Sequence, residues 1–160
     1  MMLLKCGNVL SNRDISRIFG VCVQRGIRYN GSLNKGINHV VLITVLNKTP
    51  EESVGNPYND RIEGDFLIYT GEGRIGNQKM ERGNLVLKRQ MTEGYPVFAF
   101  EKKTPGRYMF LGRYNVLSVG REIQLDIKGQ KREVFIYKLK RVSTSVSSNA
   151  VGKPNVSKSK

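Results

Sequence analysis

The hydrophobic positions along the chain form short runs of strand length, and polar segments that contain glycine or proline separate them. Residues 40–46 (VVLITVL) are continuously apolar and mostly β-branched, a pattern typical of a strand buried on both faces. Residues 122–128 instead alternate apolar and polar positions, and residues 133–142 follow after a turn at 129–130. This spacing predicts a β-hairpin. The apolar positions of its first strand are Ile123, Leu125 and Ile127.

Four further segments have the length and composition of strands. The segment at 21–29 is broken by Gly26, and the segment at 108–119 is interrupted by Gly112, which predicts a bulge or a bend. The other two strands are expected at 66–69 and 96–100. Between the strands, loops are predicted at 30–38, 47–57 and 101–107.

Two segments carry the signals of short helices. Residues 11–19 (SNRDISRIF) begin with a pair, Ser11 and Asp14, that resembles a capping box, and their apolar residues recur at helical spacing. Gly20 is expected to end this helix.

A second helix is predicted over 85–92, with Asn84 as its N-cap and Gly94 at its end. About seven strands and two short helices predict an α+β fold that is mostly β. Because the strands carry bulges and glycine bends, we expect a small curled β-barrel with short flanking helices.

The net charge of the chain points to the kind of partner. The 160 residues are enough for one domain with a substantial core, and their formal net charge is +14 at pH 7. A charge of this size favours a polyanionic partner, either nucleic acid or an anionic membrane surface. The alternative is a highly soluble basic protein without such a partner.

A membrane-spanning helix, a signal peptide and a zinc site receive no support from the sequence. The apolar runs are all shorter than the roughly 18 residues that suggest a membrane-spanning helix, and residues 1–7 are too short and weakly patterned for a signal peptide. Cys6 and Cys22 lack the spacing of zinc ligands. We expect them to be reduced and buried, which fits an intracellular, cytoplasmic location.

The most informative stretch is residues 56–79, which concentrates acidic, aromatic and glycine residues. Four of the thirteen acidic residues fall in it, and Tyr58 and Tyr69 bracket most of them. The strand at 66–69 ends in residues 70–73 (TGEG), where glycine permits positive φ or a close approach of another group. Two aromatic faces, a carboxylate and an open backbone suit a flat ring that carries an amino group. The four acids are Asp60, Glu63, Asp65 and Glu72.

Two roles are open for Tyr58, Asp60 and residues 69–71. In the first, they line a pocket for one extruded base. Stacking on aromatic rings, worth about 1–3 kcal/mol per base, would offset the cost of unstacking, and a carboxylate would accept the N4 amino group of cytosine. In the second, the tyrosines belong to a hairpin core and Asp60 hydrogen-bonds its own turn. Composition alone favours the second.

The same stretch does not predict a catalytic centre. A nuclease site built on the acidic cluster needs a catalytic lysine in strand context or a histidine nearby, and His39, the only histidine of the chain, is expected to be structural. Residues 71–73 lack the remaining signature of a nucleotide-binding loop, and Glu72 would repel phosphate. We therefore expect a binding domain with no catalytic residue, no cofactor and no metal site.

Basic residues in or next to loops are candidates for contacts with phosphates on either side of a flipped nucleotide. Arg74 and Lys79 are the strongest because they directly follow the glycine turn, and Arg28 comes next. The alternative for each is a solvated surface charge. The basic residues in or next to loops are Arg25, Arg28, Lys35, Arg61, Arg74, Lys79, Arg82, Lys102, Lys103 and Arg107. The set selected from them for contacts with the DNA backbone is Arg28, Lys35, Arg61, Arg74, Lys79 and Arg82.

The order of these pieces resembles the SRA (SET- and RING-associated) domain, which binds modified cytosine in DNA. The resemblance covers about residues 18–142, with YTGEG at 69–73 as its centre, and it extends to Gly112-Arg113-Tyr114 later in the chain. Single pieces are unspecific, but their order is specific. The central matching positions are Tyr58, Asp60, Gly64, Asp65, Tyr69, Thr70, Gly71, Gly73, Gln78 and Asn84.

This resemblance implies the SRA fold of the PUA-like superfamily. It also implies binding of double-stranded DNA whose 5-methylcytosine or 5-hydroxymethylcytosine is flipped into a pocket. By the same resemblance Tyr58 and Tyr69 would stack on the two faces of the base, and Asp60 would bind its polar edge together with the backbone of the turn 70–73. Tyr58 is one residue closer to Asp60 than in the animal proteins.

The long finger loop that animal SRA domains insert after the glycine turn is absent, and the compact form is similar to the recognition domains of prokaryotic modification-dependent restriction enzymes of the McrBC-like or HNH type. The resemblance therefore implies a cytoplasmic, nucleoid-associated protein with a nuclease or motor in another module or subunit. Residues 1–17 are expected to be a lead-in, 18–142 the DNA-binding domain, and 143–160 a flexible basic tail or linker.

Two alternative functions share parts of this pattern. A PUA-like RNA-binding domain, or another nucleic-acid-binding domain without base flipping, would have the same fold and charge but no deep aromatic pocket. A nuclease with an unusual site would cleave DNA in a metal-dependent way, although the sequence offers no adequate residues for it.

Overall fold

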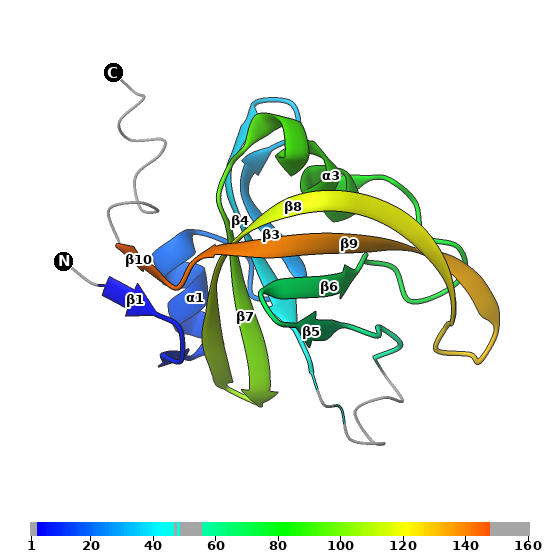
Figure 1. The fold of residues 1–160 in the computed structure, drawn as a ribbon, viewed down its shortest axis with the longest axis horizontal. Helices are drawn as coiled ribbons and strands as arrows, with labels where there is room; N and C mark the ends of the chain where they lie inside the picture. The colour runs from blue at the N-terminus through cyan, green and yellow to red at the C-terminus, as the bar shows by residue number, and fades with distance from the viewer. Residues whose placement is uncertain (1–2, 47, 49–55, 148–160) are drawn as a thin grey trace.

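The computed structural model describes residues 3–46, 48 and 56–147 and shows a strongly curved sheet with a helix on each side (Figure 1). The sheet has eight strands in the order β3-β4-β7-β8-β9-β6-β5, with the short β2 paired to β8. These strands are β2 (Val9–Leu10), β3 (Ile27–Ser32), β4 (Gly36–Thr44), β5 (Arg61–Glu63), β6 (Phe66–Thr70), β7 (Val97–Thr104), β8 (Arg107–Leu125) and β9 (Lys131–Ser143).

The pairing of these strands confirms the mostly β class and adds one crossover. β4 and β7 run parallel, with Val40 opposite Val97, and every other pair in the sheet is antiparallel. β3 and β5 are the two ends of the strand order, so the sheet curls without closing into a barrel among the described residues. Tyr69 in β6 pairs with Tyr137 in β9, which fixes the end of β6 against the longest hairpin.

The first helix, α1 (Asn12–Phe19), lies where its capping signals predict it. The Asp14 backbone N–H donates to the Ser11 hydroxyl oxygen at 3.0 Å, and Gly20 ends the helix in the left-handed conformation. Ile15 and Phe19 are its buried residues, so one face of this short helix packs on the sheet.

The second helix, α3 (Arg82–Glu93), begins earlier than the predicted segment 85–92. Its N-cap is Glu81, and Gly94 ends it as expected. The prediction that Asn84 caps this helix was wrong, because Asn84 lies inside the first turn with its side chain buried. Its amide group instead binds the glycine turn, as described below.

Two hydrophobic clusters lie on opposite sides of the sheet. Strand alternation divides them, since Val40 and Leu42 face α3 while Val41 faces α1. The cluster on the α3 side includes Tyr69 and Tyr137, which places the predicted site next to the larger core. Leu42 in β4 and Tyr69 in β6 belong to this cluster, so the same core joins the two strands.

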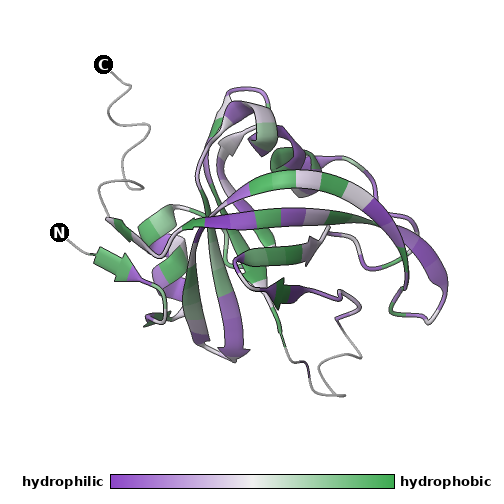
Figure 2. Ribbon diagram, viewed as in Figure 1, coloured by the Kyte–Doolittle hydropathy of each residue, from purple (hydrophilic) through white to green (hydrophobic). Residues whose placement is uncertain are grey.

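Strands β8 and β9 form a long arm that sweeps across the molecule (Figure 1). The structure joins two predicted strands into β8, and Leu111 bulges out of register where Gly112 adopts φ +132°. Hydrophobic and hydrophilic residues alternate along the arm (Figure 2). The expected apolar face at its tip is not covered, because Ile123 and Leu125 are 62% and 56% exposed.

Other boundaries differ from the sequence expectation. β3 starts only at Ile27, and the predicted loop at 30–38 is a hairpin whose strands reach Ser32 and Gly36. In the predicted loop at 47–57, residues 47 and 49–55 lie outside the described residues. None of the described helices has the length and apolar composition to cross a membrane.

The two ends of the described chain pair with each other. β1 (Leu3–Lys5) and β10 (Ser145–Ser147) form an antiparallel two-stranded sheet, with Leu4 opposite Val146. Both residues pack against the cluster on the α1 side. The predicted tail at 143–160 therefore begins with ordered strand residues, and its remaining part, 148–160, lies outside the described residues.

Candidate functional site

A cavity of about 590 Å³ lies where the ends of β4 and β6 meet the segment before β5. We call it the tyrosine cavity. It brings together five of the six predicted pocket residues, and the sixth, Gly73, borders the neighbouring cavity. Segments that are far apart in the sequence therefore form one concave surface. The five predicted residues in its wall are Tyr58, Asp60, Tyr69, Thr70 and Gly71.

The two tyrosines of this cavity differ in burial. The Tyr69 side chain is 4% exposed and belongs to the hydrophobic core, and its hydroxyl donates to the Ile43 carbonyl oxygen at 3.1 Å. Tyr58 is half-buried, and its hydroxyl oxygen accepts the Gly73 N–H at 3.3 Å. Burial raises the pKa of both hydroxyls, so both rings stay neutral at physiological pH. Tyr69 therefore forms a buried part of the cavity wall, whereas Tyr58 lies on the more exposed side of the cavity.

Asp60 supplies the carboxylate of the tyrosine cavity. Its Oδ2 accepts the Thr44 hydroxyl at 2.7 Å, and its Oδ1 accepts the Thr70 backbone N–H at 2.8 Å. Burial raises the pKa of Asp60 to about 6, although these two hydrogen bonds favour the charged form. Each carboxylate oxygen has a second lone pair, so Asp60 remains able to accept a further donor from a ligand.

The glycine turn after β6 is held by two amide side chains. Gln78 Nε2 donates to the Gly71 carbonyl oxygen at 2.5 Å, and Asn84 Oδ1 accepts the Glu72 N–H at 2.7 Å. A Cβ on Gly71 would lie 2.7 Å from Asn84 Oδ1 and 2.8 Å from Gln78 Oε1, so no larger residue fits there. The sequence matches at Gln78 and Asn84 thus identify braces of the turn.

Residues of the β8–β9 arm also form hydrogen bonds with the segment that follows this glycine turn. Arg132 is 2% exposed, and its Nη1 donates to the carbonyl oxygens of Gly73 and, at 3.3 Å, Gly76. At the tip of the arm, Asp126 Oδ2 accepts the Gly76 N–H at 3.3 Å. The path of residues 73–76 past the cavity is therefore fixed by a strand more than 50 residues later in the chain.

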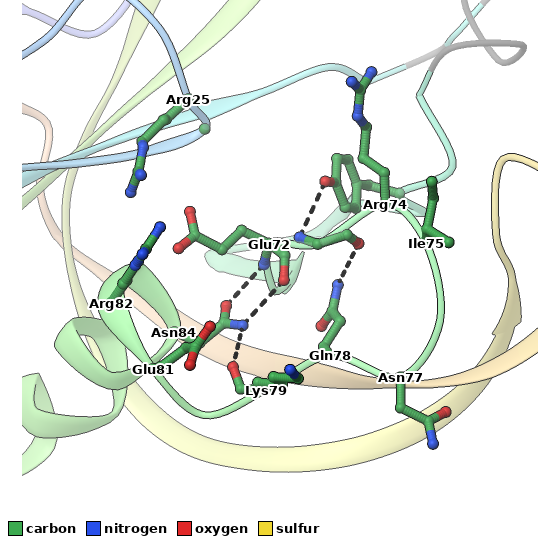
Figure 3. Close-up of a pocket in the computed structure, with 13 residues that line it drawn as sticks. Arg25, Glu72, Arg74, Ile75, Asn77, Gln78, Lys79, Glu81, Arg82 and Asn84 are labelled. Carbon is green, nitrogen blue, oxygen red and sulfur yellow. Dashed lines mark hydrogen bonds between the residues drawn. The ribbon is translucent and has the colours of Figure 1, made fainter.

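A second cavity of about 440 Å³ adjoins the tyrosine cavity, and we call it the arginine cavity. The two cavities share five residues in their walls, which are Arg25, Gly26, Tyr58, Glu72 and Arg74. Four cationic side chains line the arginine cavity, against the carboxylates of Glu72 and Glu81. Figure 3 shows the guanidinium groups from two distant segments converging near the Glu72 carboxylate. The four cations are Arg25, Arg74, Lys79 and Arg82.

The predicted backbone-binding residues fall into three groups. Arg74, Lys79 and Arg82 are exposed and border the arginine cavity, as an interface residue should. Lys35 lies in the turn between β3 and β4, at the end of that hairpin opposite the cavities. Arg61 lies in the edge strand β5 and pairs with Glu63 at 3.3 Å.

Arg28 does not suit the predicted contact with a DNA phosphate, because it is 3% exposed. Its guanidinium donates to the Arg25 carbonyl oxygen at 2.8 Å and to Asn12 Oδ1 at 2.6 Å. Burial lowers its pKa, and interaction with Tyr108 partly offsets that effect. Arg28 therefore forms part of the wall of the tyrosine cavity.

Of the residues that were expected to be buried and structural, His39 is buried and the two cysteines are not. His39 is buried, with its Nε2 at 2.5 Å from the Phe19 carbonyl oxygen, and burial lowers its pKa. Cys6 and Cys22 are free, but both are exposed, so the prediction that they are buried was wrong. Within the described ranges, no three His, Cys, Asp or Glu side chains come together in a possible metal site.

Two residues of the site, Thr44 and Arg132, were missed in the sequence. Thr44 lies at the end of a continuously apolar strand, and its polar side chain at a buried position was the available signal. Arg132 falls in the buried phase of β9, where a charge needs partners. Arg25 was one of the basic residues considered next to loops but was not selected, and the structure places it in the walls of both cavities.

The comparison with protein families gives one match, which covers most of the chain. Residues 6–153 match the family described as "ScoMcrA-like, SRA domain". This range begins before and ends after the predicted domain 18–142, and it includes β10. No curated protein sequence matches the chain.

Solved structures with the same fold include plant and restriction-enzyme domains. The SUVH5 SRA domain in complex with methylated CHH DNA is 25% identical, with a TM-score of 0.63 over 87% of this chain and 89% of that one. The ScoMcrA structure, with sulfur-binding and SRA domains bound to phosphorothioated DNA, is 21% identical, with a TM-score of 0.65. The modification-dependent restriction endonuclease AspBHI is 17% identical, with a TM-score of 0.71. This chain covers 44% of that ScoMcrA chain and 47% of AspBHI, and both alignments span 96% of this chain.

Proposed function

The chain belongs to the ScoMcrA-like SRA domain family, and from this premise we propose that it binds double-stranded DNA and holds a flipped, modified cytosine in the tyrosine cavity. The arrangement around Asp60 carries the proposal. A carboxylate with both oxygens oriented by protein donors lies in one cavity with two neutral tyrosine rings. These groups match the amino edge and the two faces of a cytosine ring.

The base would enter between Tyr58 and Tyr69, and its N4 amino group would donate to Asp60. Stacking on aromatic rings is worth about 1–3 kcal/mol per base and would offset the cost of unstacking. Ile43 and Val45 supply apolar surface in the same cavity, where a 5-methyl group would pack. Because Asp60 is held by Thr44 and Thr70 before any ligand arrives, little ordering is needed on binding.

Contacts with the DNA backbone would come from the exposed cations beside the cavity. Arg74, Lys79 and Arg82 border the opening on the side of the glycine turn. Together with the net charge of +14, they would give binding a strong dependence on salt concentration. Lys35 is too far along its hairpin to join the same set of contacts, and Arg61 is engaged by Glu63.

We propose no catalytic step for this domain. In a modification-dependent restriction system, a nuclease or a motor in another module or subunit would cleave the DNA to which this domain binds. The similarity in fold to AspBHI and ScoMcrA, whose chains are about twice as long as the part matched here, supports this arrangement.

Competition binding tests the proposal. At about 150 mM salt, where non-specific attraction is already weakened, duplexes with cytosine, 5-methylcytosine or 5-hydroxymethylcytosine would compete with one another and with matched RNA. We expect a several-fold preference for a modified duplex. Equal affinity for all duplexes, or tighter binding to RNA, would refute the proposal and favour a PUA-like nucleic-acid-binding domain without base flipping.

Variants sharpen this test. Asp60→Asn and Tyr58→Ala are expected to abolish the preference while salt-sensitive general binding remains. Tyr58 is a better target than Tyr69, because Tyr69 is a core residue whose loss would destabilise the fold. Asp65→Asn is the matched control, since Asp65 lies in the same acidic turn with a 61% exposed side chain and borders neither cavity.

A further inference from the structure

Two arginines in the described part of the chain adopt a backbone conformation that is unusual for a residue with a Cβ. Arg25 has φ +82° and Arg82 has φ +50°, and every other described residue with positive φ is glycine. Such conformations are strained for L-residues, and in folded proteins they concentrate at binding sites, where the surrounding structure holds them. Both arginines border the arginine cavity.

The guanidinium groups of these arginines are available to a ligand. Within residues 3–46, 48 and 56–147, neither side chain forms a hydrogen bond or an ion pair. Arg25 precedes β3 and Arg82 opens α3, so two distant segments bring their charges to the same place. Figure 3 shows both side chains directed toward the Glu72 carboxylate.

Glu72 explains why the two cations point into the cavity before a ligand binds. Its Oε2 accepts the Gly83 N–H at 2.9 Å in the first turn of α3, which fixes the carboxylate at the positive end of the helix. Burial raises the pKa of Glu72, while Arg25 and Arg82 act in the opposite direction, so both lie close enough to interact with it. The attraction orients the two arginines. The four cations of the cavity outnumber its two carboxylates, so the cavity attracts a phosphate although Glu72 alone would repel it.

We infer that the arginine cavity binds the phosphodiester group next to the flipped nucleotide, with Arg25 and Arg82 as its two ligands. The five residues that both cavities share, Arg25 among them, set the two cavities side by side, as a base and its neighbouring phosphate require. Guanidinium groups bind phosphate oxygens in a bidentate geometry. This inference rests on the proposed function and adds a specific phosphate position to it.

The test compares Arg25→Gly/Arg82→Gly with the unaltered protein on duplexes in which one phosphate beside the modified cytosine is an uncharged methylphosphonate. The unaltered protein should lose about tenfold in affinity when the correct phosphate is neutralised, and the double variant should show no further loss. The slope of log Kobs against log salt should fall in magnitude by about 0.9 in the double variant, the value for one phosphate contact.

Glycine is the chosen replacement because it tolerates positive φ, so the melting temperature of the double variant should be unchanged or higher. Arg89→Gln is the matched control, since Arg89 lies on the same helix with a 44% exposed side chain, near Glu93, and outside the cavities. Its salt slope should equal that of the unaltered protein.

The outcomes separate this inference from the proposed function. If the unaltered protein prefers modified cytosine but is insensitive to methylphosphonate on either side of it, the phosphate site is refuted and the base-binding proposal stands. If no preference for modified cytosine exists, the base-binding proposal fails, and the phosphate site is tested separately on unmodified DNA. There, a slope of log Kobs against log salt that is the same in the double variant and the unaltered protein overturns the phosphate site.

Discussion

The Asp60 carboxylate accepts the backbone N–H of Thr70 at 2.8 Å, and this bond joins the segment before β5 to the last residue of β6. The same carboxylate accepts the hydroxyl of Thr44, the last residue of β4. Three segments thus converge on one acidic side chain beside the cavity. Because burial raises the pKa of Asp60 to about 6, the ionised group lowers the stability of the fold at neutral pH.

The first prediction concerns the stability of Asp60→Asn. The pKa of Asp60 in the folded protein, about 6, lies above its ordinary value of 3.8, so between these values the folded state binds more protons than the unfolded state. Stability from this group is therefore present at low pH and is lost as the pH rises through about 4 to 6. Asp60→Asn removes this loss, because an amide can pair with both Thr44 and Thr70.

Denaturant unfolding of both proteins between pH 4.5 and 7.5 measures this effect. Relative to the variant, the unaltered protein should lose about 1–3 kcal/mol of unfolding free energy across the range. Asp65→Asn, which changes an exposed carboxylate paired with Arg141, should follow the unaltered protein. Parallel curves for Asp60→Asn and the unaltered protein would mean that Asp60 is not destabilised by burial.

The second prediction concerns the pH dependence of DNA binding. An ionised Asp60 accepts the amino group of cytosine, so preference for the modified duplex should weaken below about pH 6, the pKa of Asp60. Thr44→Val keeps the shape of the side chain and removes the hydroxyl that stabilises the charged form. Without this hydrogen bond the pKa of Asp60 should rise further, and the midpoint of the binding profile should move to higher pH.

Competition binding between pH 5 and 8 gives both midpoints. Thr92→Val is the control, because the Thr92 hydroxyl donates to the Arg89 carbonyl oxygen on an exposed part of α3, away from the cavities. A midpoint that is the same in Thr44→Val and the unaltered protein would show that Asp60 does not govern the pH dependence.

The elements that the sequence predicted well are those whose signals are local. The helix at 11–19 has its capping residue and its terminal glycine within nine positions of each other, and the strand at 66–69 is an apolar run next to a glycine turn. The ordered motif around Tyr58, Asp60 and Tyr69 falls in the wall of one cavity. Local pattern and motif order therefore predicted the fold class, and the binding of a base in this cavity stays a prediction.

The parts that were missed depend on contacts between distant segments. Asn is a residue type that often caps helices, but the side-chain amide of Asn84 hydrogen-bonds the backbone N–H and carbonyl oxygen of Glu72. The sequence does not indicate this contact between distant segments. Arginine is usually a surface residue, yet Arg28 is buried, where it donates hydrogen bonds to Asn12 in α1 and to Arg25 in the preceding loop. Ile123 and Leu125 alternate like buried positions, yet they lie on an arm that extends beyond the core.

The third prediction concerns Gly71→Ala. A methyl group at Gly71 would lie 2.7 Å from Asn84 Oδ1 and 2.8 Å from Gln78 Oε1, so the two braces of the glycine turn would have to move. We expect a loss of about 1–3 kcal/mol in unfolding free energy and a loss of modified-duplex preference. Gly120→Ala is the matched control, because no atom lies within 4 Å of a Cβ built at Gly120. Equal stability of the two variants would contradict the tight packing of the turn.

The fourth prediction concerns Arg132→Met, which keeps the length of the buried stem and removes its hydrogen bonds to the carbonyl oxygens of Gly73 and Gly76. The Gly73 carbonyl oxygen keeps its hydrogen bond from Gln78 Nε2 at 3.2 Å, whereas the Gly76 carbonyl oxygen loses its donor from Arg132. A carbonyl oxygen that loses its partner away from water costs about 1–3 kcal/mol, so the loop at 73–78 should open more often. Amide hydrogen exchange at 73–78 should accelerate, and the complex with modified DNA should dissociate faster. Lys131→Met, at the exposed neighbouring position, should change neither rate. If exchange accelerates equally throughout the protein, Arg132 stabilises the whole fold rather than this loop.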